Sequence, residues 1–136
     1  MLSSTIQINS SGTWRANGHN VTISGRGAVQ MFVINFGVNV TMEGLRLVDG
    51  YLRGTTGFTG GPGGAADGGA ILNFGFLTCN QCVFEGNRVF GGIGGPPFGS
   101  PGSLPGNGGP GRGGAICIGA GQVVLTDCIF RNNQSS

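Results

Sequence analysis

Five carboxylates, four cysteines and one histidine are the side chains of this chain with the most chemical potential. The acids are Glu43, Asp49, Asp67, Glu85 and Asp127, and the only histidine is His19. Enzymes that cleave acidic polysaccharides need clustered carboxylates for acid–base work, often beside Lys or Arg. Lysine is absent from this chain. The fold must therefore bring the acids together if they are to act.

The cysteines Cys79, Cys82, Cys117 and Cys128 suggest three kinds of chemistry. The C-x2-C spacing of the first pair is that of zinc and redox motifs. Cys82 and Cys128 occupy matching places in the repeats described below, and neighbouring strands are close enough for a disulfide. Buried free thiols acting as small apolar side chains are the third interpretation. Free thiols and a Cys82–Cys128 disulfide both remain open, and we expect no metal site.

Composition points to an all-β protein. Glycine supplies 31 of the 136 residues, roughly 23% and about three times the usual share. Helices are disfavoured because each interior Gly costs about 1 kcal/mol relative to Ala. Outside two glycine-rich runs, apolar and polar residues alternate as in strands. We expect one domain over residues 1–136, with no helices.

Charge and hydropathy exclude two kinds of partner. The net charge of +2 is too small to indicate nucleic-acid binding. No segment approaches the roughly 18 to 20 apolar residues that cross a bilayer, and no signal peptide is visible at Met1. We therefore expect no nucleic-acid partner and no membrane insertion.

Internal repeats set the architecture. Asn20–Gly25 matches Asn39–Gly44, and the later matches join Gly68–Ile71 to Gly113–Ile116 and Cys82–Asn87 to Cys128–Asn133. The first offset is 19 and the later two are 45 and 46, because each later unit carries a glycine-rich insert. A unit of about 19 to 23 residues with several short strands is one coil of a parallel β-solenoid. We predict about four to five coils, with inserts at 51–69 and 91–114.

Stacking the coils gives columns of equivalent residues. The predicted inward columns are Val21, Val40, Leu77, Val123; Ile23, Met42, Cys79, Leu125; Leu47, Phe84, Phe130; and Cys82 over Cys128. The predicted outward column is Thr22, Thr41, Thr78, Val124. Every inward member is apolar or a cysteine, as a core requires.

The same alignment keeps the acids apart. They stack on neutral residues, namely Glu43 on Asn80, Asp49 on Gly86 and Asp127 on Gln81. Glu85 is expected beside Arg131 of the next coil, in an exposed ion pair worth roughly 0 to 1 kcal/mol. We therefore expect no catalytic residues and no cofactor.

Two motif pairs carry a resemblance. Gly68-Gly69-Ala70-Ile71 is followed by Phe84-Glu85-Gly86-Asn87, and Gly113-Gly114-Ala115-Ile116 is followed by Phe130-Arg131-Asn132-Asn133. These GGAI and FxxN motifs resemble the repeats of polymorphic outer-membrane proteins, which are surface adhesins and autotransporter passengers. The resemblance implies a right-handed parallel β-helix of the pectate-lyase-like type and a role at the cell surface.

The residues themselves indicate structural roles for the motifs. Gly69 and Gly114 let the chain turn tightly against the neighbouring coil. Ala70, Ile71, Ala115 and Ile116 continue the buried strand, and Phe84 and Phe130 fill the core. Asn87 and Asn133 fall at a turn where their amides can bond neighbouring backbone groups and each other.

The glycine-rich inserts are the most distinctive surface. Residues 54–65 form four Gly-x-x triplets, which predict extended polyproline-II segments. Such segments would lie side by side and pack through Phe58, Ile93, Phe98 and Leu104. Flexible loops are the alternative.

Together these features predict a non-enzymatic β-solenoid, extracellular or at the cell surface, with a structural or adhesive role. A solenoid exposes unpaired strands at its ends, so we expect a homo-oligomer stacked end to end into a fibre, or a longer surface passenger. A cell-surface or glycan ligand fits the resemblance. The alternative is a carbohydrate-binding or polysaccharide-processing β-helix.

Overall fold

The computed structural model describes all 136 residues, and its only regular elements are β-strands. Every strand pair in it is parallel. The prediction of an all-β chain with stacked parallel strands is therefore confirmed. The chain contains no helix long and apolar enough to span a membrane.

Successive strands along the chain enter different sheets in turn, and we call each such circuit a tier. Tier 1 holds β1 (Ile6–Ile8), β2 (Gly12–Arg15) and β3 (Val21–Ser24). Tier 2 holds β4 (Phe32–Ile34), β5 (Asn39–Glu43), β6 (Leu45–Val48) and β7 (Tyr51–Arg53). Tier 3 holds β8 (Ala66–Asp67), β9 (Ile71–Asn73), β10 (Phe76–Asn80), β11 (Val83–Glu85) and β12 (Arg88–Phe90). Tier 4 holds β13 (Gly111–Arg112), β14 (Ile116–Ile118), β15 (Gln122–Thr126), β16 (Ile129–Arg131) and β17 (Gln134–Ser135).

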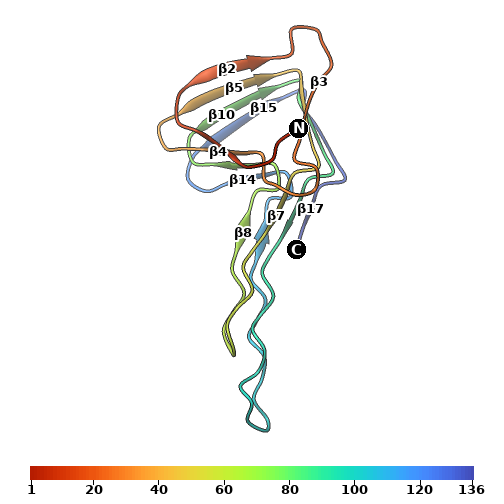
Figure 1. Cartoon of the computed structure of the whole chain (residues 1–136). Coiled ribbons are helices and arrows are strands. Elements are labelled where there is room, and N and C mark those ends of the chain that lie inside the picture. Colours follow the sequence, from red (N-terminus) through yellow and green to blue (C-terminus); the bar gives the residue numbers. More distant parts are fainter.

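Each sheet takes one strand from each tier that contributes to it. Three four-stranded sheets have the orders β1-β4-β9-β14, β2-β5-β10-β15 and β3-β6-β11-β16. The order β7-β12-β17 makes a three-stranded sheet, and β8 pairs with β13. Figure 1 shows β2, β5, β10 and β15 lying side by side across the tiers.

Single left-handed residues turn the chain between sheets. The corner after β5, β10 and β15 uses Gly44 (φ 67°), Gln81 (φ 54°) and Asp127 (φ 51°). The corner after β6, β11 and β16 uses Asp49 (φ 53°), Gly86 (φ 66°) and Asn132 (φ 54°). Gly, Asn and Asp tolerate this conformation best, which explains five of these six positions. A corner repeated in each tier keeps the strands of successive tiers in register.

The core lies between the sheets as one cluster of 17 buried residues. Leu77 pairs with Val40 on one side and Val123 on the other. Phe84 stands in the same way between Leu47 and Phe130. The predicted columns are therefore correct for tiers 2 to 4, including Met42, Cys79 and Leu125.

The predicted register of tier 1 is wrong. Val21 and Ile23 stack on Leu45 and Leu47 of β6, and not on Val40 and Met42 of β5. Trp14 of β2 lies over Met42 instead, and its ring packs edge to face with that of Phe32, with the ring centroids 5.0 Å apart.

The outward column changes with it, because Thr13, and not Thr22, pairs with Thr41. An alternating strand fits the buried face of either sheet, so the neighbouring corner decides its place. The Gly25 amide donates to the Val48 carbonyl, just as the Asp49 amide donates to the Glu85 carbonyl one tier later. This shared corner places residues 21–24 in the sheet β3-β6-β11-β16.

The two glycine-rich inserts project together from one flank. Residues 54–65 leave tier 2 after β7 and return at β8, and residues 91–110 leave tier 3 after β12 and return at β13. Figure 1 shows them as two long, narrow loops side by side beyond the stacked strands. We call residues 54–65 and 91–110 together the finger.

Candidate functional site

The GGAI segments lie where successive tiers approach closely. A Cβ atom on Gly69 would lie 2.0 Å from the Gly114 carbonyl oxygen. Ala70 and Ala115 are buried, and Ile71 pairs with Ile116. These residues pack one tier on the next and present no functional group to a ligand.

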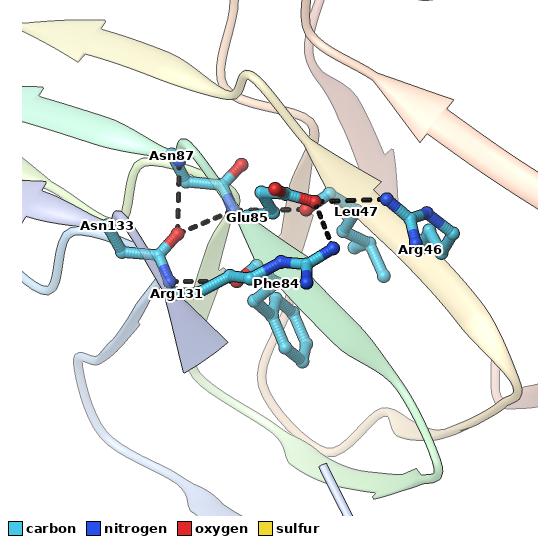
Figure 2. Close-up of polar contacts among 7 residues, drawn as sticks. All are labelled: Arg46, Leu47, Phe84, Glu85, Asn87, Arg131 and Asn133. Atoms are coloured by element: carbon cyan, nitrogen blue, oxygen red, sulfur yellow. Dashed lines mark hydrogen bonds and ion pairs between the residues drawn. The ribbon is translucent and has the colours of Figure 1, made fainter. Parts of the chain in front are cut away.

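Asn87 and Asn133 bind three tiers together (Figure 2). Asn87 is fully buried, and its Oδ1 accepts from the Gly50 amide at 2.8 Å. Its Nδ2 donates to the Leu47 carbonyl at 3.1 Å and to Asn133 Oδ1 at 2.9 Å. Asn133 Nδ2 in turn donates to the Phe84 carbonyl at 2.9 Å. Both amides are engaged within the fold, so neither is available to a substrate.

The carboxylates are held in ion pairs with arginines. Glu85 Oε2 accepts from Arg131 at 2.8 Å, which confirms the predicted pair, and also from Arg46 at 3.0 Å (Figure 2). The contact with Arg46 was not predicted. The alignment could have shown it, because Leu47 stacks on Phe84 and Arg46 directly precedes Leu47. These side chains are 30–49% exposed, so each pair contributes only about 0 to 1 kcal/mol.

The remaining acids lie elsewhere. Asp67 pairs with Arg112 at 3.2 Å and Glu43 with Arg15 at 2.8 Å. Asp49 and Asp127 occupy left-handed corners of different tiers. No group of three or more His, Cys, Asp or Glu side chains is placed to hold a metal ion.

All four cysteines are free thiols, and three of them gather in the core. Cys82 and Cys128 occupy the same place in tiers 3 and 4, directly before the paired residues Val83 and Ile129. Cys128 Sγ donates to the Cys79 carbonyl at 3.3 Å.

Hydrogen bonding and burial shift the pKa values of the cysteines. A hydrogen bond with the Cys79 thiol lowers the pKa of Cys82 to about 6. The same hydrogen bond, together with burial, raises the pKa of Cys79. Burial raises the pKa values of Cys128 and Cys117. The pKa values of Cys79 and Cys82 are therefore shifted in opposite directions.

The outer face of tier 4 is an apolar surface, which we call the open end. It contains a hollow of about 390 Å³ whose lining includes Ile116, Ile118, Val123, Leu125 and Phe130. Leu125 is 45% exposed and Phe130 44%, whereas the residues below them in tier 3, Cys79 and Phe84, are fully buried. The Phe130 ring covers that of Phe84 at 4.7 Å and leaves its own far side uncovered. The open end thus has the composition of a core surface.

Backbone hydrogen bonds hold the finger together. Gly54, Gly57 and Gly60 donate to the carbonyls of Phe90, Ile93 and Pro96 at 2.7–2.9 Å, three residues apart on both segments. The part of the first insert that runs back toward β8 is bonded as well, since the amides of Gly92 and Gly95 donate to the carbonyls of Gly64 and Gly61. Gly106 and Gly109 likewise donate to the carbonyls of Gly95 and Gly92. A period of three in extended chain is that of polyproline II, as the Gly-x-x triplets predict.

The predicted apolar anchors of the finger are only partly correct, because Phe98 alone is seen with its ring against the other insert, at Gly60. Phe58 is 85% exposed and Leu104 81%, and Ile93 and Phe98 are also exposed. Around Gly92 the segments approach too closely for side chains to lie between them, because a Cβ there would be 1.8 Å from the Thr55 carbonyl oxygen. The sequence signal for this packing was the glycine at every third residue, which allows the backbones of neighbouring segments to come into contact.

Two shallow hollows lie over the corner after β6 and β11. One, of about 360 Å³, is lined in part by Arg26, Asp49 and Arg88. The other, of about 460 Å³, shares Asp49 and Arg88 and adds Arg46. Arg26 and Arg88 form no ion pair, so two guanidinium groups remain available beside these hollows.

Comparison of the chain with protein-family models, curated proteins and solved structures finds no match in any of the three.

Proposed function

We propose that this chain is a right-handed parallel β-helix of the pectate-lyase-like type, in which each tier is one coil. Its role is structural or adhesive and not enzymatic, at the cell surface or outside the cell. Copies associate end to end into a fibre or continue a longer surface passenger. The GGAI and FxxN motifs support the fold, and the open end supports the association.

The exposure of the open end is the observation that carries this proposal. Side chains in matching columns are fully buried in tier 3 and about half exposed in tier 4, as the pairs Phe84–Phe130 and Cys79–Leu125 show. Water-exposed apolar surface costs about 25 cal/mol per Å², so covering it is favourable. Monomeric proteins rarely leave a continuous apolar patch of this kind without a partner.

The opposite end of the stack offers a complementary surface. The strands β1, β2 and β3 are edge strands of the same three sheets in which β14, β15 and β16 form the other edge. Ile6 belongs to the column that runs through Phe32 and Ile71 to Ile116. A second copy placed with tier 1 on tier 4 would continue all three sheets and the apolar column. Strand addition at exposed sheet edges is an established mode of association.

A matched pair of variants tests this association. Leu125→Glu puts a charge on the open end, whereas Val124→Glu puts it on the neighbouring side chain, which lies on the outer face of the sheet in line with Thr78. We expect fibres or oligomers of the parent chain and of Val124→Glu in sedimentation velocity and negative-stain micrographs. Leu125→Glu should give monomers with an unchanged circular dichroism spectrum. A parent chain that stays monomeric at all concentrations would overturn end-to-end association of copies.

Anionic carbohydrate is a second candidate ligand, favoured by the unpaired guanidinium groups of Arg26 and Arg88. Polygalacturonate is a suitable probe, because its carboxylates match Arg geometry. Arg26→Gln with Arg88→Gln should weaken binding at low salt, while the control Arg53→Gln should not. Equal binding by both variants would exclude this surface.

A further inference from the structure

A groove of about 650 Å³ runs along the base of the finger, separate from the open end. Its lining includes Gly91, Gly92, Gly94, Gly108 and Gly109, together with Ser136. Half of the lining residues are glycines, which present backbone amides and carbonyls, while Tyr51, Arg53, Phe90 and Ile93 supply side chains around them. The backbone of another segment can pair with the glycine part of this wall, as the segments of the finger pair with each other.

The hydrogen bonds of the finger form a series that stops in this groove. Gly54 of the tier 2 segment donates to Phe90 of the tier 3 segment, and Gly57 donates to Ile93. Gly91 donates to the Ser136 carbonyl at 2.8 Å. This is the same contact one tier later, because Arg53 pairs with Phe90 and Val89 pairs with Ser135.

The next donor of the series has no acceptor. Gly94 follows Gly91 by three residues, as Gly57 follows Gly54, but its amide donates no hydrogen bond within the chain. The Gly108 amide, on the return segment that forms the other wall, is also without an acceptor. Both residues line the groove. Two backbone donors are thus available at the place where a further segment of the finger would lie.

We propose that this groove binds an extended segment of another chain with glycine at every third residue. The bound segment would lie on residues 91–96 as those residues lie on 54–60. At that internal contact, Cβ atoms on Gly92 and Gly95 would be 1.8 and 1.7 Å from the carbonyl oxygens of Thr55 and Phe58. The bound segment therefore needs glycine at the matching positions, which makes the groove selective for Gly-x-x sequences.

This site does not depend on end-to-end association. Tier 1 has no finger, since only residues 25–31 separate β3 from β4. A copy stacked on the open end would therefore leave the groove unfilled. An experiment can therefore disprove binding at the groove without disproving stacking at the open end, and the reverse.

The test uses the full chain and a synthetic peptide of residues 91–98 (GGIGGPPF), which omits Val89 and Phe90 because Ser135 and Ser136 already occupy the matching places. In ¹⁵N–¹H NMR spectra at millimolar peptide, we expect the Gly94 and Gly108 amide resonances to shift and the Gly94 amide to exchange more slowly. The control peptide carries alanine in place of Gly92 and Gly95 and should give no shift. An unchanged Gly94 amide, or equal binding of the alanine peptide, would overturn the proposal.

Two variants separate the groove from the rest of the finger. Gly108→Val is compatible with the fold, because a Cβ there has only the Gly92 carbonyl oxygen nearby, at 3.6 Å. The added side chain enters the groove, and we expect at least a tenfold loss of peptide affinity. Gly99→Val also adds a side chain in open space, but outside the groove, and should bind like the parent chain. Equal loss in both variants would contradict the assigned site.

Discussion

Asn133 Oδ1 accepts hydrogen bonds from both the backbone amide of Asn87, at 3.0 Å, and its side-chain Nδ2, at 2.9 Å. The contact joins tier 4 to tier 3, and the Oδ1 of Asn87 repeats it by accepting from the Gly50 amide of tier 2. The side-chain ladder ends at Gly50, which has no amide side chain to continue it. A Cβ at Gly50 would in any case lie 2.8 Å from Asn87 Oδ1.

Replacing Asn87 should lower the free energy of unfolding by more than the loss of one small side chain suggests. Asn87→Ala leaves the buried Gly50 amide and Leu47 carbonyl without these partners, and we expect the free energy of unfolding to fall by about 2–3 kcal/mol. Urea denaturation followed by circular dichroism measures this change. Asn80→Ala is the matched control, because the half-buried Asn80 side chain makes no hydrogen bond. Equal destabilisation by both variants would show that the ladder contributes little.

The finger should be sensitive to a single methyl group at its inner positions. Gly92→Ala places Cβ against the Thr55 carbonyl, and such overpacking destabilises by about 1–3 kcal/mol. Gly108→Ala meets only an atom at 3.6 Å and should be neutral within about 0.5 kcal/mol. Hydrogen exchange of the Gly57 and Gly64 amides, which bond within the finger, reports the difference. Retained protection in Gly92→Ala would argue against close contact of the segments.

Cys82 should make stability depend on pH between about 6 and 9. Its pKa is about 6 in the folded chain against an ordinary value of 9.0, so its contribution is present above pH 9 and is lost as pH falls through 6. The free energy of unfolding should therefore rise from pH 6 to pH 9. The raised pKa values of Cys79, Cys117 and Cys128 act in the opposite direction, but only above pH 9.

Paired variants isolate this dependence. Cys82→Ala should remove the rise between pH 6 and 9, while Cys117→Ala should keep it. Urea titrations at a series of pH values provide the comparison. A parallel pH profile for the parent chain and Cys82→Ala would mean that Cys82 stays a neutral thiol throughout.

A disulfide between Cys82 and Cys128 stays a prediction. Adjacent parallel strands lie about 4.8 Å apart, which is within the Cα separation that a disulfide spans. Incubation with oxidised glutathione, followed by peptide mapping, should yield a Cys82–Cys128 cross-link. A cross-link between Cys79 and Cys82, or four thiols that remain unmodified, would count against it.

The sequence predicts tiers 3 and 4 well because both carry the same motifs at the same spacing. Gly69 and Gly114, Phe84 and Phe130 stand one above the other once Ile71 is aligned with Ile116. Their columns follow directly, and so does the ion pair of Glu85 with Arg131. Strong repetition fixes register because slipping one residue would turn every apolar side chain outward.

Tier 1 could not be placed in this way. The segment Val21–Ser24 resembles residues 40–43 in sequence, yet it stacks on β6. Alternation of apolar and polar residues shows which face is buried but not which sheet the strand joins. The finger shows a second limit, because its partners are backbone groups, whose pairing leaves no trace in side-chain type beyond the spacing of glycine.

Cooling should affect the two parts of this molecule differently. The stack depends on burying apolar side chains, a contribution that weakens at low temperature and gives unfolding a large heat-capacity change. The finger is held by hydrogen bonds between glycine backbones, and opening it exposes mostly polar groups, whose hydration lowers the heat capacity. Cold should therefore loosen the stacked strands before it loosens the finger, so that the least hydrophobic part of the chain becomes its most cold-resistant part.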